Sequence, residues 1–166
     1  MARILLADDS PHAQRMGERI LREEGFEVVS LTDGETALLR LADVDPDLVL
    51  ADVFLPNRSG FEVCRYIKAH PRHRHVRVVL TAGLLEPFDE DEARRAGCDA
   101  ILKKPFEASV VMSTIQPLLV EARLARGLAQ ELDPERVRAA ITIALDAALP
   151  ALIQEITERV LVALGH

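Results

Sequence analysis

Five side chains in this chain of 166 residues have the types and the placement that chemistry would require. Each follows a short apolar run, and together they are Asp8, Asp9, Asp52, Thr81 and Lys104. Clustered carboxylates favour a hard divalent cation, and Mg²⁺ prefers oxygen ligands. An aspartate can also act as a nucleophile and accept a phosphoryl group as an acyl phosphate. These residue types therefore predict magnesium-assisted phosphoryl chemistry if the fold brings them together.

The apolar runs themselves predict the strands of a parallel sheet. Strand and helix patterns alternate over residues 3–105, as in a sheet with helices on both faces. The expected strands are Arg3–Ala7, Glu27–Leu31, Asp47–Ala51, Val76–Leu80 and Asp99–Leu102. We predict an α/β fold with a five-stranded, doubly wound parallel sheet. Its strand ends open on one edge, where distant residues can converge.

Helix boundary signals agree with this division. The residues expected to open helices are Ser10 with Pro11, Thr32 with Glu35, and Ser59 with Glu62. Gly25 and Gly97 are placed where the first and fourth helices should end. The acidic run at residues 89–92 is assigned to the start of the fourth helix, because negative charge is favourable there, and not to a metal site.

The C-terminal part of the chain has a different pattern. We predict an α/β domain over residues 1–122, a linker over 123–133 and an amphipathic helical extension over 134–166. Pro117 should kink or interrupt the fifth helix. Asp133 and Pro134 should start the extension, and Pro150 should divide it into two helices or kink one. Its apolar stripe consists of Val137, Ile141, Leu145, Leu149, Leu152, Ile156, Val160 and Ala163.

One isolated amphipathic helix cannot bury its apolar face, so the stripe must pack against something. It can pack on its own α/β domain or form a homodimer with a second copy, and we favour the homodimer. The charges of the extension are near balance, which makes membrane-surface or nucleic-acid binding less attractive than a protein contact.

Composition narrows the function classes. The formal net charge is −7 and the sequence has no lysine- or arginine-rich run, which argues against binding to nucleic acid. No continuous run approaches the roughly 18 apolar residues of a membrane span, and the first residues do not form a signal peptide. We expect a cytoplasmic protein with no membrane contact. Cys64 and Cys98 are expected to be reduced core residues without chemistry.

Two further sets of polar residues could suggest a metal or anion site, but we assign no function to either. His70, His73 and His75 lie in a run that also contains arginines, and we expect a solvated loop there. Asp43, Asp45 and Asp47 alternate like calcium ligands, but the glycine and glutamate of such a loop are missing downstream. We expect these aspartates to be loop and strand-entry residues.

The ordered set of motifs resembles the receiver domain of two-component response regulators. The resemblance covers about residues 1–120 and rests on Asp8-Asp9, Asp52 in Asp-Val-Phe-Leu-Pro, Gly60, Thr81-Ala82 and Lys104-Pro105-Phe106. It implies that a histidine kinase or phosphotransfer protein phosphorylates Asp52. It also implies that Asp9, Asp52 and the backbone carbonyl of Phe54 bind Mg²⁺, with Asp8 acting mainly through water. Thr81 and Lys104 would contact the phosphoryl oxygens.

One position departs from the family pattern. Ile101 stands where such proteins usually carry an aromatic residue that reports phosphorylation, so a switch here should use backbone or loop shifts. We expect a non-enzymatic signalling protein that modifies only itself, has no DNA-binding output domain and acts on a downstream protein target. One alternative is a constitutive scaffold. The other is a magnesium-dependent aspartyl phosphatase, which Phe54 disfavours because such enzymes usually have a second aspartate there.

Overall fold

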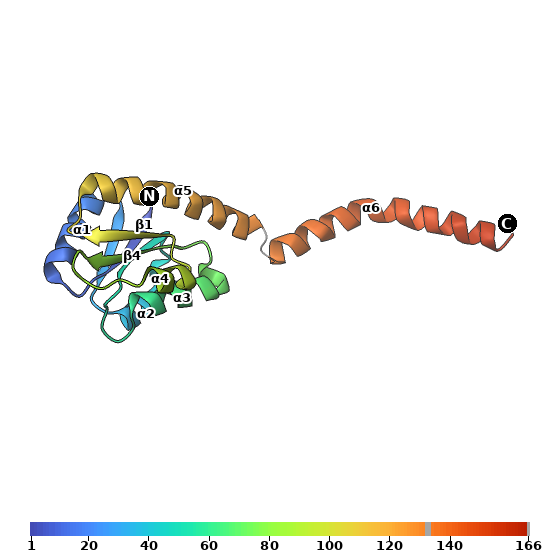
Figure 1. Ribbon diagram of the computed structural model, residues 1–166. Helices are drawn as coiled ribbons and strands as arrows, with labels where there is room; N and C mark the ends of the chain where they lie inside the picture. Colours follow the sequence, from blue (N-terminus) through green and yellow to red (C-terminus); the bar gives the residue numbers. More distant parts are fainter. Residues whose placement is uncertain (132–133, 166) are drawn as a thin grey trace. The chain divides into compact units, whose positions relative to one another are not determined.

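A computed structural model describes residues 1–131 and 134–165. The chain divides into two units, residues 1–126 and residues 127–166. The strands are β1 Arg3–Ala7, β2 Glu27–Leu31, β3 Leu48–Asp52, β4 Arg77–Gly83 and β5 Ala100–Lys104. The α-helices are α1 Pro11–Glu23, α2 Gly34–Val44, α3 Gly60–Ala69, α4 Glu90–Ala96, α5 Ala108–Glu131 and α6 Pro134–Ala163 (Figure 1).

The five strands form one parallel sheet in the order β2-β1-β3-β4-β5. This confirms the predicted α/β fold. The order reverses between β1 and β3, and in such sheets ligands bind outside the carboxyl ends of the strands at this reversal. The structure extends β3, β4 and β5 beyond their expected ends, so that Asp52, Thr81 and Lys104 belong to the strands themselves.

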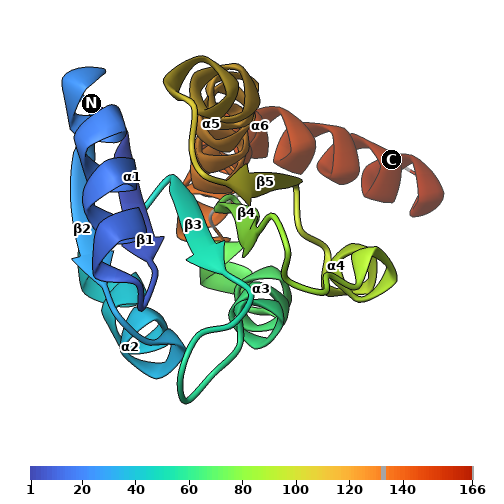
Figure 2. The same ribbon diagram turned by 60° about the vertical axis from the view of Figure 1, so that its left-hand side comes forward.

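Helices cover both faces of the sheet (Figure 2). One core contains apolar residues of α2, α3 and α4, among them Leu41, Ile67 and Ala93. The other contains residues of α1 and α5, among them Leu21 and Ile115. Strand β3 contributes alternately to the two cores, and all five of its residues are buried. The central strand that carries Asp52 is thus held between two packed layers.

Most predicted helix starts are confirmed. The Ser10 hydroxyl caps α1, and Ser59 with Glu62 forms the capping box of α3. The expected box of Thr32 with Glu35 is wrong, because α2 begins one residue later. Its cap is Asp33, whose carboxylate accepts hydrogen bonds from both the amide and the hydroxyl of Thr36 at 2.8 and 2.7 Å.

Helix α5 is longer and more continuous than the sequence indicates. It passes through Pro117 without a break and reaches Glu131, so residues 123–131 are helical where a linker was expected. An interior proline costs about 3 kcal/mol. Ile115 and Leu119 are buried on either side of Pro117, and their packing offsets that cost. The rest of the expected linker and the Asp133 cap lie at residues 132–133, outside the described residues.

Helix α6 runs without interruption through Pro150, and none of its described residues is buried. The predicted stripe is present as exposed apolar side chains, including Ile141, Leu145 and Ile156. By length and composition α6 could cross a membrane. The search of the sequence for a continuous apolar run did not detect this helix. The sequence has no unbroken apolar run there, but a helix can be apolar on average despite isolated charges such as Asp146.

Candidate functional site

The register of the sheet brings the predicted residues to one edge. Ala7 pairs with Ala51, so Asp8 and Asp52 come next on neighbouring strands. Asp52 pairs with Thr81 across β3 and β4. Gly83 pairs with Lys104 at the ends of β4 and β5. A parallel sheet with this order therefore gathers four chain segments around Asp52.

Lys104 joins two of the aspartates. Its ammonium donates hydrogen bonds to Asp52 Oδ2 at 2.7 Å and to Asp8 Oδ2 at 3.1 Å. Both carboxylates are almost fully buried, with side-chain exposures of 4% and 1%. A buried charge is tolerated only when it is paired and hydrogen-bonded, and Lys104 supplies that pairing. The neighbouring Lys103 points elsewhere, with its ammonium 4.7 Å from the centre of the Phe88 ring.

Both oxygens of the Asp52 carboxylate are fixed in place. Oδ1 accepts a hydrogen bond from the backbone amide of Phe54 at 3.0 Å, and Oδ2 accepts from Lys104. The Phe54 side chain is half exposed. Thr81 is buried beside Asp52, and its carbonyl accepts from the amide of Val53 at 2.9 Å. The carboxylate is therefore oriented by its surroundings before any ligand arrives.

Burial and charge act against one another on the ionisable groups. Burial raises the pKa of Asp8, although hydrogen bonds from the Ser10 amide and Lys104 act in the lowering direction. Burial alone would lower the pKa of Lys104, but the hydrogen bonds and charges of Asp52 and Asp8 outweigh it and raise that pKa. Lys104 is therefore a permanent cation at neutral pH.

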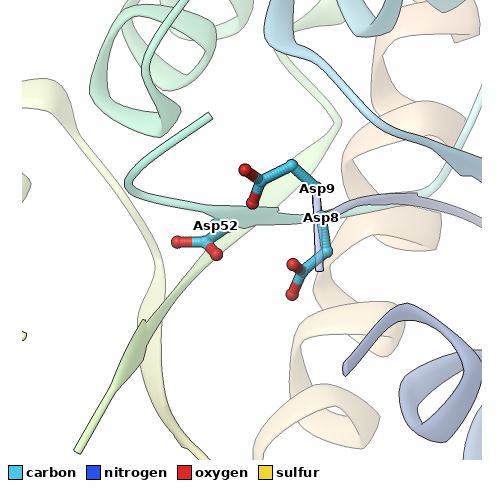
Figure 3. A group of neighbouring side chains, drawn as sticks. All are labelled: Asp8, Asp9 and Asp52. Atoms are coloured by element: carbon cyan, nitrogen blue, oxygen red, sulfur yellow. The ribbon is translucent and has the colours of Figure 1, made fainter. Parts of the chain in front are cut away.

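The three aspartates form a cluster with the donor chemistry of a Mg²⁺ site. One carboxylate oxygen from each of Asp8, Asp9 and Asp52 lies within 4.8 Å of the others. Figure 3 shows the three side chains gathered at the ends of β1 and β3. Asp9 is exposed, so one side of the cluster is open to solvent and its ions. Hard carboxylate oxygens with one open side suit Mg²⁺, which keeps several of its waters.

Gln14 supports the site but escaped sequence analysis, and the role of Gly60 is explained only by the structure. Gln14 donates hydrogen bonds to the carbonyls of Asp8 and Leu31 at 3.3 and 2.9 Å, and this holds the loop after β1. Gly60 lies against the backbone of Asp52, where a Cβ would overlap the Asp52 carbonyl oxygen. Gly60 was noted as a motif residue, but only the three-dimensional contact explains why glycine is needed. No spacing signal points to Gln14.

A second polar cluster lies at the amino end of the sheet. Arg126 binds Asp45 at 2.7 Å and Asp47 at 3.1 Å. It also donates to the carbonyls of Asp45 and Pro46 at 3.3 and 3.4 Å. Asp45 and Asp47 are loop and strand-entry residues, as expected, but Asp43 lies in the last turn of α2, so the prediction of a loop is wrong there. Their pairing with a residue about 80 positions away was not foreseen.

The prediction of a solvated histidine loop is wrong for two of the three residues. His73 and His75 are each only 8% exposed. Burial lowers the pKa of both side chains, and the charge of Arg126 lowers that of His75 further. The run looks hydrophilic in sequence, but its short helical turn at Pro71–His73 folds back onto the domain. The cysteines agree with expectation, since Cys64 is buried and burial raises the pKa of its thiol to about 12.

Comparison with known proteins gives one consistent result for the α/β unit. Residues 4–116 match the family described as the response regulator receiver domain. Response regulator PleD of Caulobacter vibrioides is 37% identical over 117 residues, which cover 70% of this chain and 26% of PleD. The chain therefore spans only about a quarter of that relative.

Solved structures agree with the sequence matches. A putative response regulator from Chloroflexus aurantiacus superposes with a TM-score of 0.68 at 27% identity, covering 72% of this chain and 98% of that one. The receiver domain of the sensor histidine kinase PA1611 from Pseudomonas aeruginosa has a TM-score of 0.66 at 28% identity, with coverage of 72% and 98%. That structure has a magnesium ion coordinated in its active site cleft.

Proposed function

The chain belongs to the response regulator receiver domain family, and on that premise we propose that it accepts a phosphoryl group on Asp52 in a two-component phosphorelay. The donor is a histidine kinase or a phosphotransfer protein. The modified protein signals through altered contacts with a downstream protein target. Its chemistry is confined to its own aspartate, so it does not act as an enzyme on other substrates.

One observation carries this proposal more than any other. Asp52 is a nearly buried carboxylate whose two oxygens are held by the Phe54 amide and by Lys104. Phosphoryl transfer depends mostly on positioning and on stabilising charge over the phosphoryl oxygens. A fixed nucleophile beside a permanent cation meets both needs.

The remaining roles are those that the family resemblance implies. Asp8, Asp9, Asp52 and the carbonyl of Phe54 would hold Mg²⁺, with Asp8 acting mainly through water. The ion supplies charge neutralisation for the phosphoryl group. Lys104 stabilises phosphoryl oxygens, and the Thr81 hydroxyl donates to one of them. Asp52 attacks phosphorus through one of its two carboxylate oxygens.

The switch must work without an aromatic residue at position 101. Ile101 is partly buried against the core of α2, α3 and α4. The loop after β4 is closed by a hydrogen bond from the Gly83 amide to Glu86 at 2.6 Å, and its Phe88 ring packs at 6.1 Å from Phe61. Because β4 ends only two residues after Thr81 and leads into this loop, we assign to the loop the movement that follows phosphorylation.

Incubation with Mg²⁺ and acetyl phosphate, followed by intact mass measurement, tests the phosphorylation. We expect the mass of one phosphoryl group, lost in Asp52→Asn and lost when Mg²⁺ is chelated. Asp47→Asn is the matched control at the amino end of the sheet and should label like the wild type. Absence of labelling in the wild type would favour the constitutive scaffold. Turnover of unrelated phosphate esters would favour the aspartyl phosphatase.

Helix α6 supplies a second part of the proposal, a homodimer. Two antiparallel copies centred between Ala148 and Leu149 would place equivalent stripe residues opposite one another: Val137 with Val160, Ile141 with Ile156, and Leu145 with Leu152. All six side chains are exposed in the single chain. A bilayer is a less suitable partner, because Asp146 near the helix centre would cost about 3 kcal/mol there. A cytoplasmic location fits both the dimer and a kinase donor.

Truncation after Arg126 tests the dimer. The shortened protein should still be labelled by acetyl phosphate, because the α/β unit retains its site and the Arg126 contacts. Analytical ultracentrifugation should give a dimer mass for the full chain and a monomer mass for the truncated one. Equal association states for the two proteins would rule out dimerisation through α6, and release of the full chain only by detergent would favour a membrane.

A further inference from the structure

A cavity of about 460 Å³ lies beside the acidic cluster. Its lining comes from the first two turns of α1, from the end of β4 with the loop after it, and from the end of β5 with the residues after it; it includes Met16, Gly83, Leu84, Glu86, Lys104 and Phe106. The volume lies within the range of about 300 to 1,000 Å³ that is usual for small-molecule sites.

Each wall of this cavity continues a strand that carries a residue of the site. The α1 wall begins a few residues after Asp8 and Asp9. The second wall begins two residues after Thr81, and the third begins at Lys104 itself. The cavity therefore lies at the same carboxyl edge of the sheet as Asp52, and it shares Lys104 with the phosphoacceptor cluster.

The walls are mainly apolar. Met16, Leu84, Leu85 and Phe106 supply the large side chains. Leu84 and Leu85 are 70% and 96% exposed, so a ligand could cover apolar surface that the chain itself leaves open. The Glu86 carboxylate accepts a hydrogen bond from the Gly83 amide. Lys104 thus remains as the cation that links the cavity to the buried aspartates.

We propose that this cavity binds the acyl group of a small-molecule phosphodonor, namely an acyl phosphate with an apolar acyl part. The inference rests on the proposed phosphorylation of Asp52 and names the class of small donor that the same site prefers. The donor's phosphoryl group lies at Asp52 and Lys104, while its aromatic or aliphatic part lies between Met16 and Leu84.

The transfer balances without another reactant. A carboxylate oxygen of Asp52 forms a bond to phosphorus, and the bond between phosphorus and the bridging oxygen of the donor breaks. The donor leaves as a free carboxylate with that electron pair, so no proton must be supplied. The acyl part changes position little in this step, and the cavity can hold it throughout.

The size of the donor's acyl group determines which phosphodonor the cavity is expected to prefer. An acetyl group places a single methyl in the cavity, whereas a benzoyl ring can contact both apolar walls. Each methylene in a well-fitting apolar pocket changes discrimination by about 10- to 200-fold. We therefore expect a preference for benzoyl phosphate that depends on the residues of the walls.

The test compares phosphorylation rate constants for benzoyl and acetyl phosphate, measured by intact mass with Mg²⁺ present. The readout is the rate constant for benzoyl phosphate divided by that for acetyl phosphate. The intrinsic reactivities of the two donors affect this ratio equally in every protein, so they cancel when a variant is compared with the wild type. We expect Leu84→Gln and Met16→Gln each to lower this ratio about ten-fold. Leu39→Gln is the control, since Leu39 is a 75% exposed leucine of α2 outside the cavity lining, and it should keep the wild-type ratio.

The outcomes separate the two proposals. If acetyl phosphate does not label wild-type Asp52, the proposed function fails. If acetyl phosphate labels Asp52 but all four proteins give the same ratio, the acyl subsite is overturned while the proposed function stands. Binding of phenacylphosphonate, an unreactive analogue of benzoyl phosphate, provides an equilibrium check by calorimetry. It should bind about ten-fold more tightly than acetonylphosphonate to the wild type, and equal affinities would also overturn the subsite.

Discussion

The two ends of the sheet each hold one basic side chain between two aspartates. At the carboxyl end Lys104 lies between Asp8 and Asp52, and at the amino end Arg126 lies between Asp45 and Asp47. The ionic distances at both ends fall between 2.7 and 3.1 Å. Similar residue types at similar distances nevertheless serve different purposes.

The difference lies in the shape of the basic group and in the number of carboxylates that surround it. The Arg126 guanidinium divides its donors between two carboxylates and two backbone carbonyls. Its planar fork suits fixed, bidentate contacts, whereas a lysine ammonium is a compact charge with rotatable donors. The carboxyl end also has a third carboxylate, the exposed Asp9, and so three aspartates face one lysine. The amino end is a structural clamp, and the carboxyl end keeps negative charge available for a metal ion.

Replacing the two basic residues in the same way should separate these roles most clearly. We expect Lys104→Met to slow phosphorylation by acetyl phosphate about 10²- to 10³-fold, the usual loss when one group that stabilises transition-state charge is removed. Arg126→Met should stay within about two-fold of the wild type, because its contacts lie at the other end of the sheet. Time courses of intact mass at saturating Mg²⁺ measure both effects. Equal losses in the two variants would contradict the division of roles.

The carboxyl end was predictable from sequence because its residues obey a local rule. Each follows or ends an apolar strand, and parallel strands present those ends at one edge. The register of Ala7 with Ala51 then follows from the fold and not from any further signal. Lys104 could also be chosen over Lys103, since the family lysine immediately precedes the proline.

The amino end was not predictable, because its contacts depend on the exact length of α5. Sequence rules predicted a kink or interruption at Pro117 and a linker from residue 123, which would have left Arg126 without a fixed position. Packing of Ile115 and Leu119 instead carries the helix past the proline and brings Arg126 to Asp45. His75 was misjudged for the same reason, because its burial comes from tertiary contacts and not from local composition.

Removing the clamp should have the next largest effect, this time on stability. We expect Arg126→Met to lower the free energy of unfolding by about 2 kcal/mol, because Asp47 would be left mostly buried without its ionic partner, with only the Arg3 backbone amide still donating to its carboxylate. Arg123→Met, at an exposed position on the same helix, should change it by less than about 0.5 kcal/mol. Urea unfolding followed by circular dichroism measures both variants. Similar losses would show that the helix, and not the clamp, is what these arginines support.

The smallest expected effect is a pH dependence of the free energy of unfolding that comes from the histidines at the amino end of the sheet. Burial lowers the pKa of His75 below its ordinary value of 6.5, and Arg126 and His73 act in the same direction against the opposing charges of Asp45 and Asp47. The unfolded chain therefore binds a proton more readily than the folded protein. The free energy of unfolding should be level above pH 6.5 and should fall as the pH drops below it.

His75→Gln should remove part of this loss of unfolding free energy at low pH. The rest should come from His73, because burial lowers the pKa of that side chain as well. The control is His12→Gln, an exposed position on α1, which should keep the wild-type pH profile. Urea titrations between about pH 5 and 8 in Asp52→Asn, where phosphorylation cannot occur, isolate the effect from the chemistry of the other end. If the profile of His75→Gln matched that of His12→Gln, protonation of His75 would make no contribution to the pH dependence of stability at the amino end.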